Sequence, residues 1–183
     1  MLILASASPR RAEILSMLGY QFEFIPAQCD ENTDGLTAKE AVGELARRKA
    51  QAVANLYPDL AVLGSDTLVT LEGKVLGKPK TEADAIDMLT TLSGKTHSVF
   101  TGISVVKGSE CITEVVEAKV TFRTLTKEEI ADYVATGEPM DKAGAYGIQG
   151  KGAILIDYIE GDFFNVMGLP AARVHLLLKK FGF

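Results

Sequence analysis

The chain has 183 residues, of which 47% are hydrophobic and 23% charged, and its formal net charge is −5. These values are typical of a globular protein with one compact domain or two intimate lobes, and they exclude a disordered or low-complexity chain. No apolar run approaches the ~20 residues that span a bilayer, and the acidic balance disfavours a surface that coats nucleic acid.

The two cysteines, Cys29 and Cys111, lie far apart in the sequence and have no metal-ligand spacing. No basic segment precedes an apolar one at the N-terminus, as it would in a signal peptide. Two reduced thiols without a leader are typical of a cytoplasmic protein. We therefore expect a cytoplasmic location, with neither a membrane nor a nucleic acid as partner.

In the first half of the chain, strand-like and helix-like segments alternate. Residues 2–5 form a short apolar strand, and Pro9 suits the first position of the following helix, with Ser8 as its N-cap. The segments predicted after this helix are a strand beginning at 22 with an acidic loop to 35, a helix in 37–57, a buried strand in 61–67, a hairpin in 68–79 and a helix in 81–94.

The second half of the chain is richer in strands. Residues 97–108 and 112–125 have strong β propensity and are predicted to be antiparallel neighbours. They are followed by a helix in 126–137, a glycine-rich loop in 138–152, a strand in 153–161 and a closing helix in 168–182. The meandering central strands among helices predict an α/β fold with a mixed, twisted sheet flanked by helices.

Three of the predicted helices begin with a capping box, in which a threonine precedes an acidic residue by three positions. The pairs are Thr37 with Glu40, Thr81 with Asp84, and Thr126 with Glu129. Gly94 and Gly137 are expected to end the second and third of these helices.

Two arginines, Arg10 and Arg11, stand in the first turn of the first predicted helix, where the helix dipole is already positive. Each costs roughly 0.3–1 kcal/mol there. Together with Ser6, Ser8 and the free N–H groups of the helix, they would form a cradle for phosphate. The alternative is an ordinary cap followed by two solvated arginines.

Helical spacing places Lys49 near the centre of the apolar stripe of the helix in 37–57, whereas Arg47 and Arg48 fall on other faces, where water can solvate them. An inward lysine needs a partner or a route to water. Either its stem lies along the apolar surface with the ammonium in solvent, or the ammonium points at an anion in a cleft.

Carboxylates stand at two places where they would meet such an anion. Asp66 lies at the end of the buried strand, where α/β proteins place their sites, and is a candidate general base or metal ligand. The acidic loop with Asp30, Glu31 and Asp34 would supply oxygen ligands for Mg²⁺ or Mn²⁺. The alternatives are a turn aspartate and a solvated loop.

Two further segments carry candidate ligand-binding residues. Lys78 precedes a proline that stiffens its turn, and the glycines around Gln149 allow close approach of the backbone to a ligand. The amide of Gln149 can read a base edge with one donor and one acceptor. Ordinary turns are the alternative for both. Cations and flexible backbone around two carboxylate groups suit a phosphorylated substrate with a metal ion.

The motifs taken together resemble the Maf family of nucleoside triphosphate pyrophosphatases. Their order and approximate spacing match over essentially the whole chain, and they are SASPRR at 6–11, DE at 30–31, RKA at 48–50, GSDT at 64–67, GKP at 77–79, LSGKTH at 92–97, EPMDKAGAYGIQG at 138–150 and NVMGLP at 165–170. The resemblance implies an ITPase-like fold with a cleft between two lobes, formed by residues 1–183 as a single domain.

The resemblance also implies a reaction, in which a divalent metal cation assists hydrolysis of a nucleoside triphosphate to the monophosphate and pyrophosphate. Asp66 is then the proton acceptor, and Glu31 and Asp66 are the carboxylates near the metal. The family's phosphate-binding set falls on Ser8, Arg11, Lys49 and Lys78. A homodimer is plausible by analogy with the family.

Three positions bear on the choice of base under this resemblance. Arg10, Thr67 and Gln149 place the chain with the members that act on dTTP and UTP, or on modified pyrimidine triphosphates, rather than with those that act on 7-methyl-GTP. The alternative function is a non-catalytic, nucleotide-binding regulator of cell division. A protein that only binds nucleotide gains nothing from carboxylates beside the phosphates, which favours the enzyme.

Overall fold

The computed structural model describes residues 1–183, and seven strands form one sheet in the order β2-β1-β3-β5-β6-β7, with β4 paired to β3. The strands are β1 Leu2–Ala5, β2 Phe22–Phe24, β3 Ala61–Leu71, β4 Lys74–Leu76, β5 Thr96–Lys107, β6 Glu110–Phe122 and β7 Ile156–Glu160. β1 pairs in parallel with β2 and β3, whereas β4 on β3 and β7 on β6 are antiparallel. The predicted mixed sheet flanked by helices is confirmed.

The helices begin and end close to their predicted positions, except α5, which was not predicted. They are α1 Pro9–Met17, α2 Ala38–Ala54, α3 Glu82–Leu92, α4 Lys127–Ala135, α5 Phe163–Met167 and α6 Ala171–Lys180, with short 3-10 helices η1 Glu138–Asp141, η2 Ala143–Ala145 and η3 Gly150–Leu155. All three capping boxes form. Ser8 occupies the N-cap position of α1, as predicted, and its side chain makes no capping hydrogen bond.

Residue contacts divide the chain into two compact units. Unit 1 consists of Met1–Thr67, Phe100–Val116 and Phe164–Phe183, and unit 2 of Leu68–Val99 and Glu117–Phe163. Each unit is made of separate stretches of the sequence. The boundaries between the units fall within β3, β5 and β6, so each of these strands supplies residues to both. The single domain and the cleft between two lobes stay predictions.

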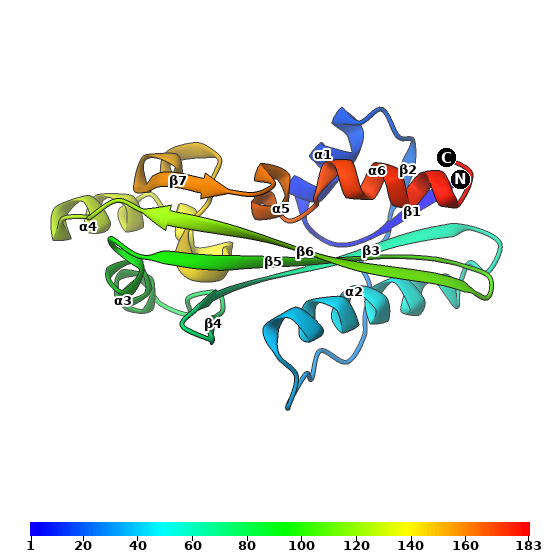
Figure 1. Ribbon diagram of the computed structural model, residues 1–183, viewed down its shortest axis with the longest axis horizontal. Coiled ribbons are helices and arrows are strands. Elements are labelled where there is room, and N and C mark those ends of the chain that lie inside the picture. Colours follow the sequence, from blue (N-terminus) through cyan, green and yellow to red (C-terminus); the bar gives the residue numbers. More distant parts are fainter. The chain divides into compact units, whose positions relative to one another are not determined.

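In unit 1, α2 lies against one face of the strands, and α1 and α6 lie against the other (Figure 1). Its core includes a cluster of buried apolar residues from β1, α2, β3 and β5, which are Ile3, Ala5, Ala50, Val53, Ala54, Val62 and Val106. α2 approaches the sheet closely at two glycines, because a Cβ on Gly64 would overlap Ala46 and one on Gly102 would overlap Val42.

In unit 2, α3 packs against α4 and against η1 and η2. The predicted hairpin forms from β3 and β4, and it turns at Glu72 and Gly73, whose φ angles of 51° and 79° are typical of a two-residue hairpin turn. The rings of His97, Phe122 and Tyr146 meet edge to face, with centroids 4.8 to 5.3 Å apart.

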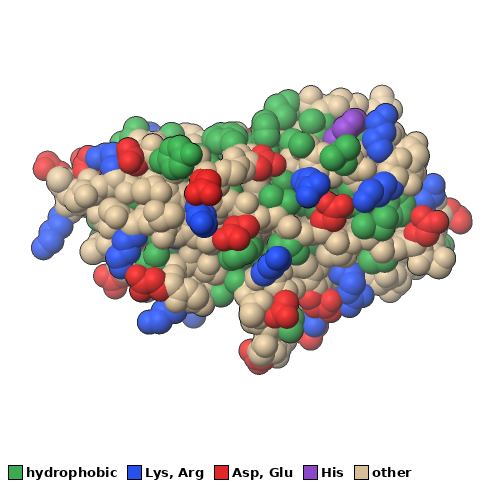
Figure 2. Space-filling model, in the orientation of Figure 1, with side chains coloured by type: hydrophobic (Ala, Val, Ile, Leu, Met, Phe, Trp, Pro, Cys, Tyr) green, Lys and Arg blue, Asp and Glu red, His purple; other side chains and the backbone are tan.

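The surface mixes charges of both signs. On the face seen in Figure 2, Lys and Arg side chains are interspersed with Asp and Glu side chains, and no continuous band of one sign is visible. No helix of the protein has the length and apolar character that a membrane span requires.

Candidate active site

Lys49 forms ion pairs with two carboxylates in unit 1. The Nζ of Lys49 lies 2.7 Å from Oδ1 of Asp66 and 2.8 Å from Oε1 of Glu31. The side chains of Lys49 and Asp66 are only 16% and 14% exposed, whereas that of Glu31 is 63% exposed. The ammonium therefore has its partners within the protein, and its role toward an anion in a cleft stays a prediction.

The close approach of α2 and β3 places this pair. Gly64 has no side chain, so the strand lies directly against Ala46 and Ala50 of α2. Successive side chains of a strand alternate between its faces, so Asp66 points to the same side as Gly64. Lys49 precedes Ala50 on the helix and meets Asp66 there.

The two carboxylates stabilise the positive charge of Lys49. Burial by itself would lower the pKa of Lys49, but the carboxylate of Asp66, and after it that of Glu31, outweigh burial, and the pKa of Lys49 is raised. Lys49 is therefore an ammonium ion at neutral pH, a cation fixed beside two carboxylates.

The loop that carries Glu31 is held by an arginine of α2. Nη1 of Arg48 donates to the carbonyl oxygens of Asp30 at 3.1 Å and Asn32 at 2.7 Å, while its Nε donates to Glu44 at 2.7 Å. The interpretation of Arg48 as a solvated side chain is wrong for this reason. Arg47 fits it, since it lies exposed and pairs with Glu44.

On the other face of β3, Arg11 links separate parts of unit 1. Its Nε donates to the carbonyl oxygen of Gly168 at 2.8 Å, Nη1 to Oγ of Ser6 at 3.1 Å and Nη2 to Oγ1 of Thr67 at 3.1 Å. Burial lowers the pKa of Arg11 and Asp66 opposes that effect, yet a guanidinium stays charged at neutral pH. The predicted phosphate ligand and the predicted base-selecting threonine thus touch each other.

Hydrogen bonds on this other face of β3 also hold the residues next to Asp66. Ser65 donates to the carbonyl oxygen of Gly168 at 3.0 Å. Thr67 shares a hydrogen bond of 3.0 Å with Thr101, whose hydroxyl also donates to the carbonyl oxygen of Asn165 at 2.8 Å. The neighbours of Asp66 on both sides are therefore tied to α5 and to the turn that follows it.

Several of these residues were not singled out from the sequence. Ser65 and Thr101 donate hydrogen bonds to backbone carbonyl oxygens, and Gly168 supplies one of these oxygens. The partners lie far apart in the sequence, so no local pattern predicts such contacts. The one signal for Gly168 is its place in the NVMGLP motif at 165–170, which had no role assigned.

Ser8 and Arg10 stand at the N-terminus of α1, both half-buried. The first turn of α1 carries no acidic residue, so nothing there offsets the positive end of the helix dipole. The backbone N–H of Ser8 donates to Oγ of Ser6 at 3.2 Å. The proposed anion cradle thus has its backbone already ordered.

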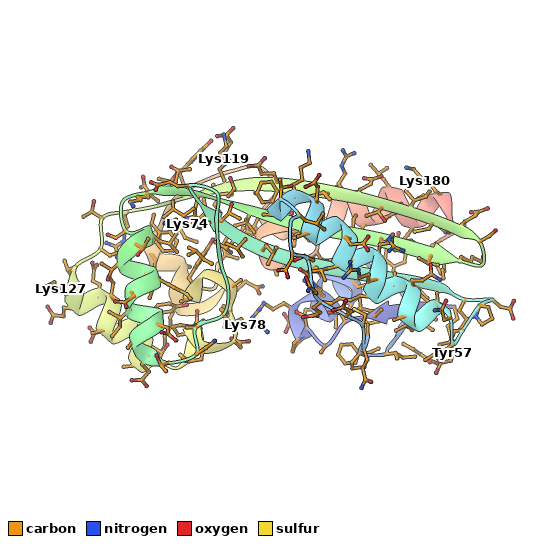
Figure 3. The ribbon with its side chains drawn as sticks, turned by 90° about the horizontal axis from the view of Figure 1, so that it is seen from below. Tyr57, Lys74, Lys78, Lys119, Lys127 and Lys180 are labelled. Carbon is orange, nitrogen blue, oxygen red and sulfur yellow. The ribbon has the colours of Figure 1, made fainter.

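Lys78 and Gln149 belong to unit 2, and both are exposed. Lys78 follows β4, in the loop that leads to α3 (Figure 3). Gln149 lies in the glycine-rich segment directly before η3.

The donor set of unit 1 fits a divalent cation of the magnesium type. Both Glu31 and Asp66 reach the same Nζ atom, so their oxygens converge on one point. Magnesium is commonly held by one or two carboxylates, with substrate phosphates and water as its other ligands. No group of three or more His, Cys, Asp or Glu side chains is arranged to hold a metal ion, so a closed site made of protein ligands alone is absent.

Comparison with known proteins gives close relatives of the whole chain. The family model described as Maf-like protein matches residues 1–181. A protein of Moorella thermoacetica named dTTP/UTP pyrophosphatase is 55% identical over 99% of this chain and 95% of its own. A protein of the same name from Bacillus thuringiensis subsp. konkukian is 48% identical over 98% of this chain and 95% of its own.

Solved structures give a more distant likeness. A nucleoside-triphosphatase described as a dITP/XTP pyrophosphatase, from Mycobacterium abscessus, is 14% identical with a TM-score of 0.48, covering 97% of this chain and 94% of that one. The Ham1 protein of Staphylococcus aureus is 18% identical with a TM-score of 0.48, covering 86% and 80%. The family therefore rests on the sequence matches alone.

Proposed function

Because the chain belongs to the Maf family, we propose that it is a nucleoside triphosphate pyrophosphatase that hydrolyses dTTP and UTP to the monophosphate and pyrophosphate. The observation that carries this proposal is the near full-length identity with relatives of that name. The ion pair of Lys49 with Asp66 and Glu31 supports it, because it brings together a cation for phosphate and a carboxylate for proton transfer.

Asp66 is the proposed proton acceptor for the water that attacks the α-phosphorus. The carboxylate is largely buried, and hydrogen bonds of the neighbouring residues Ser65 and Thr67 hold the strand that carries it. It therefore does not need to be ordered when substrate binds. A general base in this position contributes typically a hundred- to ten-thousand-fold in rate. Lys49 forms an ion pair with Asp66 in the resting protein and binds the phosphates instead when substrate arrives.

The leaving pyrophosphate accumulates negative charge, which cations stabilise most where water is scarce. The proposed phosphate-binding set is Ser8, Arg11, Lys49 and Lys78. Arg11 uses three N–H groups on Gly168, Ser6 and Thr67, and a guanidinium carries more donors than these bonds use. With an anion at the N-terminus of α1, the helix dipole and both arginines act in the same direction.

We further propose Glu31 and Asp66 as the residues that hold a divalent cation, Mg²⁺ or Mn²⁺. Such an ion would polarise a phosphoryl oxygen and neutralise part of the charge of the triphosphate. Glu31 is exposed enough to turn between Lys49 and a bound ion, while the loop behind it stays tied to Arg48.

Arg10, Thr67 and Gln149 are the proposed determinants of the base. We also propose a cytoplasmic location, where a pool of nucleoside triphosphates is available. Cys29 and Cys111 are both free thiols, as that location requires. A homodimer remains a proposal by analogy with the family.

The direct test is to incubate the purified protein with dTTP, UTP, dCTP, dATP and 7-methyl-GTP, each with Mg²⁺ or Mn²⁺. Pyrophosphate and orthophosphate are assayed separately. We expect pyrophosphate and the monophosphate from dTTP and UTP, at rates well above those for the other nucleotides. Orthophosphate as the primary product would contradict the proposed bond cleavage.

The Asp66→Asn variant separates catalysis from binding, because it removes the carboxylate charge and keeps the shape of the side chain. We expect turnover to fall by a factor of about 10² to 10⁴, while binding of dTTP stays measurable by calorimetry. A wild-type protein that binds dTTP and cleaves no triphosphate would instead support the alternative, a nucleotide-binding regulator.

A further inference from the structure

The glycine-rich segment of unit 2 closes into a narrow-necked loop with Gln149 near its tip. Gly147 and Gly152 stand at its two ends, and a Cβ on Gly152 would overlap the carbonyl oxygen of Gly147. The same Cβ would lie 2.7 Å from the hydroxyl of Tyr133. The two ends of the loop therefore meet at the side chain of one tyrosine of α4.

Tyr133 and Glu138 bind the backbone on both sides of Gln149. The hydroxyl of Tyr133 accepts from the N–H of Gly147 at 3.1 Å and donates to Oε1 of Glu138 at 3.0 Å. The carboxylate of Glu138 accepts from the N–H groups of Lys151 and Gly152, each at 3.0 Å. Two side chains thus fix the loop before and after Gln149.

Tyr133 and Glu138 have the protonation states that their hydrogen bonds require. Burial raises the pKa of Tyr133, so the phenol keeps the proton that it donates. Burial also acts to raise the pKa of Glu138, but the N–H groups of Gly152 and Lys151 outweigh it, and the pKa lies below its ordinary value. At neutral pH Glu138 is a carboxylate, which is the stronger acceptor.

Gln149 itself is exposed, so the protein controls its direction mainly through the backbone from which the side chain projects. The next position requires glycine, because Gly150 has φ 77° and a Cβ there would lie 2.9 Å from Oε2 of Glu138. The loop is therefore shaped around the carboxylate of Glu138.

We propose that Tyr133 and Glu138 are positioning residues that hold Gln149 for recognition of the base, and that the enzyme's preference among nucleobases depends on them. This inference rests on the proposed function, in which Gln149 contacts the base. Neither side chain needs to touch the substrate, since both act through the N–H groups of Gly147, Lys151 and Gly152.

The test compares Tyr133→Phe and Glu138→Gln with the wild type, each alone and combined with Gln149→Ala. Tyr133→Phe removes one hydroxyl, and Glu138→Gln removes the charge at constant shape. Glu128→Gln is the matched control, because Glu128 is an exposed residue of the same helix, α4, as Tyr133. Steady-state constants are measured for dTTP, UTP, dCTP and dATP.

We expect KM for dTTP to rise about 3- to 10-fold in Tyr133→Phe and more in Glu138→Gln, with kcat changed less, because one lost hydrogen bond corresponds to a factor of that size. The preference for dTTP over dCTP should fall in both variants. In the Gln149→Ala background neither substitution should reduce the preference further, as expected for residues that act through Gln149. An equal loss for all four nucleotides, or additive losses with Gln149→Ala, would overturn the inference.

Two measurements do not depend on hydrolysis. Hydrogen exchange should accelerate at the amides of Lys151 and Gly152 in Glu138→Gln and at the amide of Gly147 in Tyr133→Phe, but at none of them in Glu128→Gln. Unchanged exchange would contradict the proposed anchoring. Calorimetry gives the affinity for dTTP and dCTP. A wild-type protein that cleaves neither nucleotide, but whose binding preference falls in the two variants, would refute the proposed function and support this inference.

Discussion

The Nζ of Lys49 lies 2.7 Å from Oδ1 of Asp66, and both side chains are largely removed from water. The carboxylate of Asp66 favours the charged form of Lys49 in the resting protein and raises its pKa. A triphosphate carries more negative charge than one carboxylate and competes for the ammonium. Under the proposed function, binding of substrate would free the carboxylate of Asp66 as it engages the cation of Lys49, and the two events would be coupled.

Lys49→Gln should weaken the reaction of every triphosphate by the same factor. The substitution removes a charge-assisted contact to phosphate, which is worth about 10- to 100-fold in kcat/KM, and the ranking of the bases should not change. Lys39→Gln is the matched control, since Lys39 is an exposed lysine of the same helix. The constants for dTTP, UTP and dCTP are compared, and a changed ranking would argue against a role at the phosphates.

Arg48→Gln should lower activity although Arg48 is not proposed to touch substrate. The variant loses the hydrogen bonds to the carbonyl oxygens of Asp30 and Asn32, so Glu31 is presented on a looser loop. We expect kcat/KM to fall about 3- to 10-fold for all substrates. Arg47→Gln, the adjacent substitution, loses only the bonds to Glu44 and should stay within about 2-fold of the wild type. Equal losses of kcat/KM in the two variants would show that the hydrogen bonds of Arg48 to the loop of Glu31 do not contribute to activity.

Local signals predicted most of the helices and the direction of Lys49. A capping box lies within four residues, and helical spacing alone places Lys49 on the apolar stripe of α2, so neither depends on the rest of the chain. The five-residue helix α5 was not predicted, because it is too short to show a period. The strand predicted from 153 begins at Ile156, since η3 occupies the residues before it.

The contacts that complete the site could not be predicted in the same way. Arg11 and Gly168 are separated by 157 positions, and their hydrogen bond exists only because β1, β3 and the turn after α5 are neighbours in unit 1. Arg48 was interpreted as solvated because its helical face is polar, but the loop carbonyls that it binds belong to another segment. Sequence patterns identify charged residues, and tertiary structure decides which of them meet.

Gly168→Ala should destabilise the protein and disturb the site together. The residue has φ 106°, and a Cβ would lie 3.2 Å from Oγ1 of Thr67 and 3.5 Å from Nε of Arg11. Gly182→Ala is the control, because Gly182 has φ 87° with nothing within 4 Å of its Cβ. Both variants carry backbone strain of about 1–3 kcal/mol, so the additional loss in Gly168→Ala measures the crowding.

Urea unfolding should show that Gly168→Ala lowers the free energy of unfolding by about 1 kcal/mol or more beyond the loss in Gly182→Ala. Turnover should fall in Gly168→Ala alone, since Arg11 and Thr67 must move to admit the methyl group. Equal losses of stability in the two variants, with unchanged turnover, would contradict a role for this turn in ordering Arg11 and Thr67.

His97 should make the stability of the protein depend on pH between 4 and 6.5. Burial lowers the pKa of His97 from 6.5 to about 4, and its Nδ1 has no hydrogen-bond partner. Below pH 6.5 the unfolded chain binds a proton at this residue that the folded protein does not, so stability is lost as the pH falls from 6.5 to about 4. At a pH below both values, this difference in pKa lowers the free energy of unfolding by about 3 kcal/mol. Unfolding by urea should show this loss in the wild type and in His175→Gln, whose histidine is exposed, and much less of it in His97→Gln. An NMR titration in which the ring of His97 protonates near pH 6.5 would contradict the prediction directly, because the neutral ring would then gain nothing from burial beside Tyr146.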